Sequence, residues 1–307
     1  MLKILYIMGA SRSGSTLLDT VLSDQPGVFG AGELCNLISA MDIRRNYCAC
    51  GSRSAECPLW VAVRREWSSS TGPDVASRYT ELRSSVERIR NYPRFRERAA
   101  DDHRLQEYLR LSKALFEAIA KVSGATTIVD SSKGPIRALA LSRMEGVEFR
   151  IIHLVRDVRG VAHSLAQSFD SDPRGGVMTP LEGKSSLRAA RKWMLTNMIA
   201  DGVRARVGNR ATLLRYEDYV TSPRATLARL STFAGLDFMP TAEKLEHGGA
   251  FKSGHTIEGN RLRTFERIQL RPDVRWRKQM SKAKKSLLPL FTAPVSWKYG
   301  YRPWSEG

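Results

Sequence analysis

The sequence lacks any run of about 20 apolar residues, the length that a membrane-spanning helix requires. Yet 42% of its 307 residues are hydrophobic, enough for a well-buried core. The apolar run at residues 4–8 leads directly into a glycine-rich turn and is too short for the core of a signal peptide. We find no internal repeat and no low-complexity tail. These features favour a cytoplasmic protein with a single domain over residues 1–307.

Acidic residues are scarce relative to basic ones. The chain has 31 Asp and Glu against 49 Lys and Arg, a formal net charge of +18. Such a charge attracts anions, whether a polyanionic cofactor, an acidic glycan, an anionic membrane or a nucleic acid. The motifs of zinc fingers, homeodomains and RNA-recognition domains are missing, so no specific nucleic-acid partner is expected. Peripheral contact with an anionic membrane and the oligomeric state both stay open.

Only four cysteines occur, Cys35 and the close group Cys48, Cys50 and Cys57. No Cys-x-x-Cys pair is present, so their spacing differs from that of common zinc sites. Free thiols are the default state in a reducing cytoplasm. The sequence therefore favours structural thiols, with a disulfide and a metal site as the alternatives.

Residues 9–16 read Gly-Ala-Ser-Arg-Ser-Gly-Ser-Thr, between an apolar run and a helical pattern. The P-loop of nucleotide-binding proteins, Gly-x-x-x-x-Gly-Lys-Ser/Thr, shares the two glycines and the final hydroxyl residue. Backbone N–H groups of such a loop converge on an anion. Here Ser15 replaces the lysine that contacts the β- and γ-phosphates, and a cation occurs earlier, at Arg12. We therefore predict an anion other than a nucleoside triphosphate, with a plain strand-to-helix connection as the alternative.

Apolar, β-branched segments alternate with helical patterns along the chain. Strands are predicted at residues 4–8, 27–33, 125–130, 148–155 and 211–215. Helices are predicted at residues 158–168 and 185–207. This alternation predicts a three-layer α/β/α fold with a mainly parallel central sheet, similar to that of P-loop NTPases.

Two segments interrupt the alternation. Residues 35–122 contain the cysteine group and helical patterns broken at Pro93, which predicts a Cys-rich and helical insertion. Residues 170–183 are rich in Asp, Pro and Gly, which predicts a mobile loop. We expect both segments to shape a substrate pocket.

Arg156 follows the strand predicted at residues 148–155, and Ser164 comes eight positions later. Two helical turns span about 7.2 residues, so both side chains can point to one side of the sheet's carboxyl edge. A guanidinium and a hydroxyl donor suit a phosphate monoester. A strand-end salt bridge with a capping serine is the alternative.

These motifs resemble those of the sulfotransferases that use 3′-phosphoadenosine 5′-phosphosulfate (PAPS). Their first cofactor motif, Arg-Ser-Gly-Ser/Thr-Thr-Leu, is similar to residues 12–17, which gives the candidates Arg12, Ser13, Gly14, Ser15 and Thr16. In that family the residues matching Arg156 and Ser164 hold the 3′-phosphate. The resemblance implies transfer of a sulfuryl group from PAPS, with 3′-phosphoadenosine 5′-phosphate (PAP) as product and no metal required.

Two later segments add cofactor-binding candidates through the same resemblance. Residues 215–219, Arg-Tyr-Glu-Asp-Tyr, are similar to a segment whose tyrosine contacts the cofactor in the tyrosylprotein branch, which points to Tyr216. Residues 259–263 resemble a Gly-Asn-Pro-x-Arg segment of bacterial relatives, in the region where a loop closes over the cofactor. This match gives Gly259, Asn260 and Arg263, with Arg261 in the place of the proline.

Sulfuryl transfer also needs a base, because the acceptor hydroxyl loses a proton as it attacks sulfur. Glu33 matches the Gly-Glu position that supplies this base in the tyrosylprotein branch, and a glutamate at a helix N-terminus is the alternative. His153 and His163 are rival bases. Lys133 matches a lysine near the sulfuryl group, where it and Arg12 would stabilise developing negative charge.

Two other function classes remain as alternatives. A nucleotide kinase or other P-loop phosphotransferase would need a lysine at the Ser15 position. A non-enzymatic polyanion-binding protein is supported by net charge alone. The acceptor is not named by the sequence, and a small molecule, a lipid, a glycan or a peptide tyrosine could supply its hydroxyl.

Overall fold

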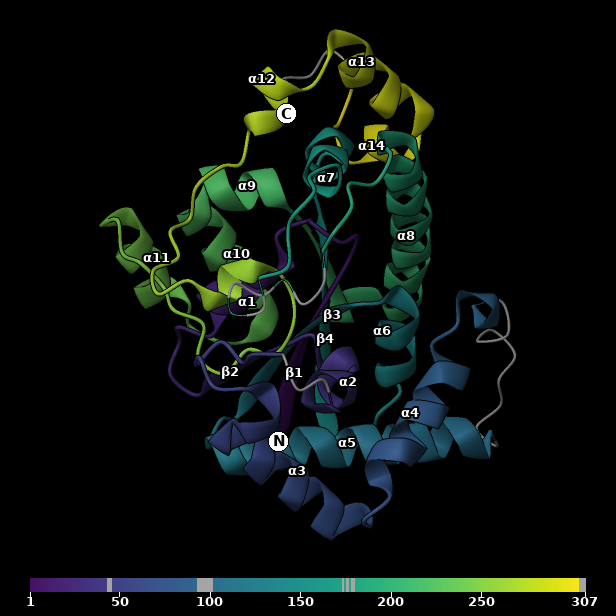
Figure 1. Ribbon diagram of the computed structural model, residues 1–307, viewed down its shortest axis with the longest axis vertical. Helices are drawn as coiled ribbons and strands as arrows, with labels where there is room; N and C mark the ends of the chain where they lie inside the picture. The colour runs from purple at the N-terminus through teal and green to yellow at the C-terminus, as the bar shows by residue number, and fades with distance from the viewer. Residues whose placement is uncertain (43–45, 93–101, 173, 175–176, 178–179, 304–307) are drawn as a thin grey trace.

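A parallel five-stranded sheet lies at the centre of the molecule (Figure 1). The computed structural model describes residues 1–307 except 43–45, 93–101, 173, 175–176, 178–179 and 304–307. The strand order is β2-β3-β1-β4-β5, and every neighbouring pair is parallel. The strands are β1 (Leu2–Met8), β2 (Val28–Gly32), β3 (Thr127–Lys133), β4 (Val147–Val155) and β5 (Ala211–Arg215).

Helices connect the strands and cover the sheet. They are α1 (Ser15–Leu22), α2 (Leu37–Asp42), α3 (Pro58–Thr71), α4 (Val75–Val86), α5 (His103–Ser123), α6 (Pro135–Leu141), α7 (Val158–Leu165), α8 (Ser186–Val207), α9 (Tyr216–Thr221), α10 (Pro223–Ala234), α11 (Met239–Glu246), α12 (Arg275–Gln279), α13 (Lys282–Phe291) and α14 (Val295–Lys298). Short 3-10 turns include η1 (Leu34–Asn36) and η6 (Arg261–Thr264). Among the described residues, no helix combines the length and apolarity that crossing a membrane would require.

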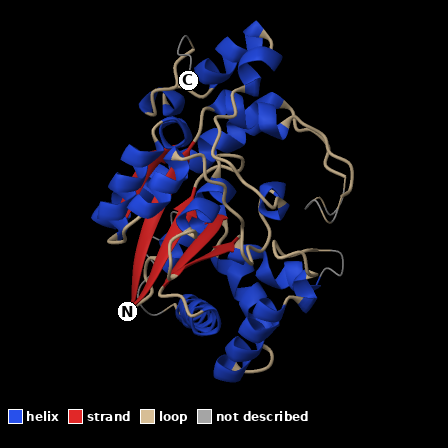
Figure 2. Ribbon diagram, turned by 90° about the vertical axis from the view of Figure 1, so that its left-hand side faces the viewer, coloured by secondary structure: helices blue, strands red, loops and turns tan. Residues whose placement is uncertain are grey.

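Both faces of the sheet are buried. Successive strand residues point to opposite sides, so each strand contributes side chains to both cores. From β1, Ile4, Tyr6 and Met8 enter a core shared with α5, α6 and α8. Leu5 and Ile7 enter a second core shared with α1, α10 and α11. Figures 1 and 2 show helices on both sides of the sheet. The prediction of a three-layer α/β/α fold is confirmed, and the strands read as apolar runs because neither face meets water.

Helices α2 to α5 lie between β2 and β3, in the segment predicted as an insertion. The rings of Tyr79 and Tyr108 stack with centroids 5.6 Å apart, and Trp67 meets Tyr79 edge-on at 5.3 Å. These contacts pack α3, α4 and α5 together. The predicted break at Pro93 lies outside the described residues.

Two predicted boundaries can be compared with the structure. Helix α7 ends at Leu165, three residues before the predicted end at residue 168. At this end the Lys184 N–H donates to the Leu165 carbonyl at 2.8 Å. The loop predicted at residues 170–183 is described only in part. Its described residues fold back on themselves through bridges between Phe169 and Leu181 and between Asp172 and Val177.

Candidate active site

The turn between β1 and α1 places the predicted anion-binding residues at the carboxyl edge of the sheet. Its backbone has positive φ at Gly9 (150°), Arg12 (68°) and Gly14 (95°). A Cβ at Gly9 would lie 2.2 Å from the Leu154 carbonyl oxygen, so β1 approaches β4 this closely only with glycine. Gly14 is the N-cap of α1. The first N–H groups of a helix have no acceptor within it and attract an anion.

The hydroxyl residues of this turn are buried beside the start of α1. Ser13, Ser15 and Thr16 are each less than a tenth exposed. Within the described part of the chain, Ser13 Oγ is enclosed and has no hydrogen-bond partner. Buried hydroxyls are normally hydrogen-bonded, so this unsatisfied group fits a site that receives an oxygen-rich ligand.

Arg156, at the end of β4, is buried and joins this turn to a segment near the C-terminus. Its guanidinium donates to the carbonyl oxygens of Arg12 at 3.1 Å and Asp273 at 2.9 Å. It also lies 3.2 Å from the Asp273 carboxylate. Ser164 is half-buried in the last turn of α7, the helix that begins just after Arg156. The structure therefore places both residues on one strand–helix unit.

Tyr216 forms an aromatic wall next to the turn. A Cβ at Gly14 would lie 2.6 Å from the Tyr216 ring, and the Arg156 guanidinium lies 4.5 Å from the ring centroid. The Asp273 N–H donates to the Tyr216 hydroxyl at 3.2 Å. Burial raises the pKa of Tyr216, so its side chain stays neutral. Tyr216 thus has a flat apolar face at the turn and a hydroxyl fixed by backbone groups.

Glu33 and Lys133 form an ion pair at the ends of the neighbouring strands β2 and β3. Their side chains are 17% and 15% exposed, so the pair is partly desolvated yet still accessible. Lys133 has a left-handed backbone (φ 68°), which is strained for a residue with a side chain, and its carbonyl accepts the Gly9 N–H at 3.0 Å. Burial lowers the pKa of Arg12, and the nearby charge of Glu33 opposes this shift. Glu33 and Lys133 are therefore in direct contact, and Arg12 lies near enough to Glu33 for their charges to interact.

The segment after α11 returns to this edge and covers it. Ile257 pairs with β2 through two backbone hydrogen bonds. The Glu33 N–H donates to the Ile257 carbonyl at 2.9 Å, and the Ile257 N–H donates to the Ala31 carbonyl at 3.1 Å. A Cβ at Gly259 would lie 3.0 Å from Thr16 Oγ1 and 3.4 Å from Glu33 Oε1. The segment thus connects the anion-binding turn with the predicted base.

Asn260 and Arg263 hold this segment in place. The Asn260 N–H donates to Thr16 Oγ1 at 3.1 Å. Arg263 is buried and donates to the carbonyl oxygens of Gly259 and Tyr47, both at 3.4 Å. Burial lowers the pKa of Arg263. Its guanidinium therefore connects the covering segment to the backbone at Tyr47, just before the cysteine group.

The two rival bases lie in different surroundings from Glu33. His153 is fully buried in β4, its Nε2 lies 3.0 Å from Asn197 Oδ1, and burial lowers its pKa to about 4. His163 is half-buried on α7, and its Nε2 has no partner among the residues described. Of the three, Glu33 is the one in contact with both Lys133 and the covering segment.

Sequence reasoning missed a buried arginine that joins the insertion to β3. Arg137 is 1% exposed and lies 3.2 Å from the Asp130 carboxylate and 2.8 Å from that of Glu87. It also donates to the hydroxyls of Tyr79 at 2.9 Å and Tyr108 at 2.8 Å. A buried charge needs such a full set of partners. The available signal was Asp130, a carboxylate at the end of the strand predicted at residues 125–130.

A second missed residue is Asp19, which is fully buried in α1. The Gly32 N–H donates to its carboxylate at 3.1 Å. Burial raises the pKa of Asp19 to about 7. The signal was a carboxylate within the apolar helical pattern after the turn.

An open groove of about 700 Å³ lies in the insertion, and its lining begins one residue after Glu33. Its wall begins at Leu34 and Cys35 and continues over α2 and along α4 to Arg83. The groove lies within the segment predicted to shape a substrate pocket.

Comparison with known proteins gives consistent results. A profile described as the sulfotransferase family matches residues 5–240. Human carbohydrate sulfotransferase 6 is 29% identical over 168 residues, which cover 51% of this chain but only 42% of the human protein. The sulfotransferase domain of the Synechococcus PCC 7002 olefin synthase superposes with a TM-score of 0.54 at 19% identity, over 98% of this chain and 96% of that domain. A sulfotransferase domain from the curacin biosynthetic pathway gives 0.50 at 18% identity, over 98% and 99%. At these identities the structural likeness shows the fold alone.

Proposed function

The chain belongs to the sulfotransferase family, and we propose that it transfers a sulfuryl group from PAPS to a hydroxyl acceptor. One observation carries this proposal: the anion-binding turn without a P-loop lysine lies between two sets of side chains. The Glu33–Lys133 pair lies at the ends of β2 and β3, and the stacked Tyr216 and Arg156 lie on the β4 and β5 side. We further propose that residues 1–307 act as one domain.

The turn fits the phosphosulfate of PAPS. Ser13, Ser15 and Thr16 supply hydroxyls, and the start of α1 supplies backbone N–H groups and the positive end of its dipole. Arg12 and Lys133 stabilise negative charge on the departing phosphate oxygen and on the sulfuryl oxygens. A sulfuryl group carries less charge than a terminal phosphoryl group, so these two cations suffice and the transfer itself needs no metal.

We assign the other end of PAPS to Arg156, Ser164 and Tyr216. The guanidinium and the hydroxyl bind the 3′-phosphate, and the Tyr216 ring contacts the nucleoside. Gly259, Asn260 and Arg263 belong to the segment that covers the bound molecule.

Glu33 is the proposed general base. It takes the proton of the acceptor hydroxyl as the acceptor oxygen forms a bond to sulfur. The bond between sulfur and the 5′-phosphate oxygen breaks in line with this attack, and PAP leaves with the electron pair of that bond. The pair with Lys133 holds the carboxylate at the sheet edge before the acceptor arrives.

The groove is the proposed acceptor site, because its lining begins at Leu34, one residue after the proposed base. The chemistry requires a hydroxyl on a small molecule, a lipid or a glycan. The name of the human relative makes a glycan hydroxyl the first to be tested, by screening acceptors with radiolabelled PAPS.

The 3′-phosphate assignment can be tested by ligand-induced thermal stabilisation. PAP should stabilise the protein more than AMP does, and PAP at 100 times its Kd should add about 2.7 kcal/mol. Ser164→Ala should reduce the PAP effect and leave the AMP effect unchanged. The matched control is Ser168→Ala, just beyond α7, whose exposed side chain bonds the Gly183 N–H at 3.1 Å.

Equal stabilisation of the wild-type protein by PAP and AMP would contradict the assignment. Turnover of ATP with magnesium would instead indicate a phosphotransferase.

A further inference from the structure

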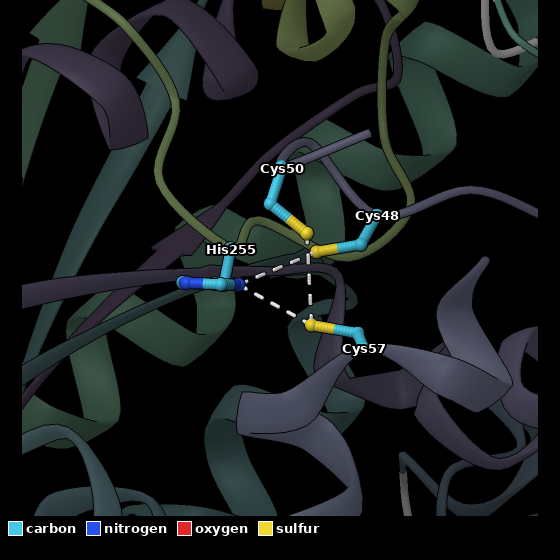
Figure 3. A group of neighbouring side chains, drawn as sticks. All are labelled: Cys48, Cys50, Cys57 and His255. Atoms are coloured by element: carbon cyan, nitrogen blue, oxygen red, sulfur yellow. Dashed lines mark hydrogen bonds between the residues drawn. The ribbon is translucent and has the colours of Figure 1, made fainter. Parts of the chain in front are cut away.

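Three thiols and an imidazole from distant parts of the chain meet beside this site (Figure 3). Cys48, Cys50 and Cys57 lie between α2 and α3, whereas His255 lies in the covering segment after α11. Their four candidate ligand atoms all lie within 4.8 Å of one another. Cys50 Sγ is 3.7 Å from Cys57 Sγ, and His255 Nδ1 is 3.2 Å from Cys57 Sγ and 3.9 Å from Cys48 Sγ.

The three separations of 3.2–3.9 Å are close to the edges of a tetrahedral metal site. Zinc binds thiolates at about 2.3 Å and imidazole nitrogen at about 2.0 Å, which sets ligand atoms about 3.5–3.8 Å apart at the corners of a tetrahedron. A disulfide would instead bring two sulfurs to about 2.05 Å. All four cysteines of the chain are free thiols. We propose that Cys48, Cys50, Cys57 and His255 bind one zinc ion.

The ligand set determines both the metal and its role. Thiolate and imidazole ligands favour zinc, whereas magnesium and calcium prefer oxygen ligands. Four protein ligands complete the tetrahedron and leave no position for a substrate, which is the pattern of a structural site. Cys48 and Cys57 are buried, and Cys50 is exposed, which gives the ion a route of entry from solvent.

The backbone around the four ligands is already ordered by hydrogen bonds. The Trp60 indole donates to the His255 carbonyl at 2.7 Å, and the Ala49 N–H donates to the Thr256 carbonyl at 3.2 Å. Gly51 has a φ of 91°, and the Cys48 N–H donates to the Ser52 carbonyl at 2.9 Å. Such outer contacts orient metal ligands. They hold the cysteine turn and the histidine segment face to face.

The position of the cluster defines what the ion would do. Two residues after His255, Ile257 pairs with the backbone of Glu33, and Asn260 bonds Thr16. The zinc would therefore fasten the covering segment to the cysteine turn. This role is structural and does not depend on which group the enzyme transfers.

The direct test is the metal content of the full-length protein, purified without chelators from cells grown with zinc. We expect one zinc per chain by mass spectrometry. Cys57→Ser and His255→Gln should each lower this content at least tenfold. The matched control is Cys35→Ser, because Cys35 lies outside the cluster and should leave one zinc bound.

Cobalt exchange provides a second readout that does not rely on variants. The cobalt-loaded wild-type protein should show thiolate-to-cobalt charge-transfer absorption and the strong visible bands of a tetrahedral site. Chelation of the metal should lower the melting temperature and expose three more thiols to alkylation. The proposal is overturned if the wild-type protein folds without metal and its melting temperature does not change when zinc or a chelator is added. A disulfide between two of the cluster cysteines would also overturn it. PAP binding is measured separately, so neither result decides the sulfotransferase proposal.

Discussion

Two ion pairs at the end of β3 use similar groups in different surroundings. Asp130 and Arg137 are 0% and 1% exposed, and the guanidinium also contacts Glu87 and two tyrosine hydroxyls. Glu33 and Lys133 are 17% and 15% exposed, and the contact from Asn36 to Glu33 is long, at 3.4 Å. A charge removed from water persists only with a full set of partners, so the buried pair is structural. The accessible pair keeps charge available to a ligand, which suits catalysis.

The largest expected effect is on stability, and it distinguishes the buried Asp130–Arg137 pair from an accessible pair. Arg137→Met leaves the Asp130 carboxylate buried without its partner, so the free energy of unfolding should fall by about 3–5 kcal/mol. Denaturation by urea would measure this loss. The control, Arg150→Met, breaks the half-exposed Arg150–Glu148 pair and should cost less than about 1 kcal/mol. Equal losses in the two variants would remove the distinction between buried and accessible pairs.

The next effect concerns activity. Glu33→Gln keeps the shape of the side chain but removes the proposed base, so sulfuryl transfer should slow by about 10²–10⁴-fold while PAP binding persists. Transfer of label from radiolabelled PAPS to an acceptor found by screening would measure this rate. Glu66→Gln alters another Glu–Lys pair, Glu66–Lys121 in the insertion, and should leave the rate unchanged. Full activity of the Glu33 variant would assign the base to another group, with His163 the next to examine.

The smallest effect tests a residue between the two pairs. Ser132 Oγ donates to the Asp130 carboxylate and accepts the Cys35 N–H at 3.0 Å, close to Glu33. Ser132→Ala should lower the free energy of unfolding by about 1 kcal/mol, the net value of a typical hydrogen bond. The exposed Ser84→Ala should change it by less than about 0.5 kcal/mol in a parallel urea titration. No difference between the two variants would show that Ser132 does not support the buried pair.

Features that depend on nearby residues could be predicted from the sequence. The apolar run of β1 and the glycines at positions 9 and 14 specify a strand, a turn and a helix within about 20 residues, and the structure has all three. The parallel fold followed because helical and apolar segments alternate. The end of α7 was wrong by three residues, because a backbone bond from Lys184 is not visible in local propensity.

Contacts between distant residues were outside the reach of such reasoning. Arg137 and Glu87 are 50 positions apart, and Cys57 and His255 are 198 apart. Cysteine spacing alone argued against a metal, and the proposed fourth ligand, His255, lies in the distant covering segment. Sequence reasoning did place Glu33, Lys133 and Arg12 at one sheet edge, since the carboxyl ends of parallel strands share that edge. Their assigned roles stay predictions.

The contact between Arg156 and Asp273 has a consequence for how the enzyme would bind PAPS and release PAP. The Asp273 carboxylate pairs with the Arg156 guanidinium as a phosphate would. Hydrogen bonds from Arg275 help to hold the pKa of Asp273 well below its usual range. Under the proposed assignment of Arg156 to the 3′-phosphate, binding would exchange one anion for another, and the net affinity would be the difference between two ion pairs. Under the same assignment, the Asp273 carboxylate would compete with the 3′-phosphate for Arg156 and so assist the departure of PAP.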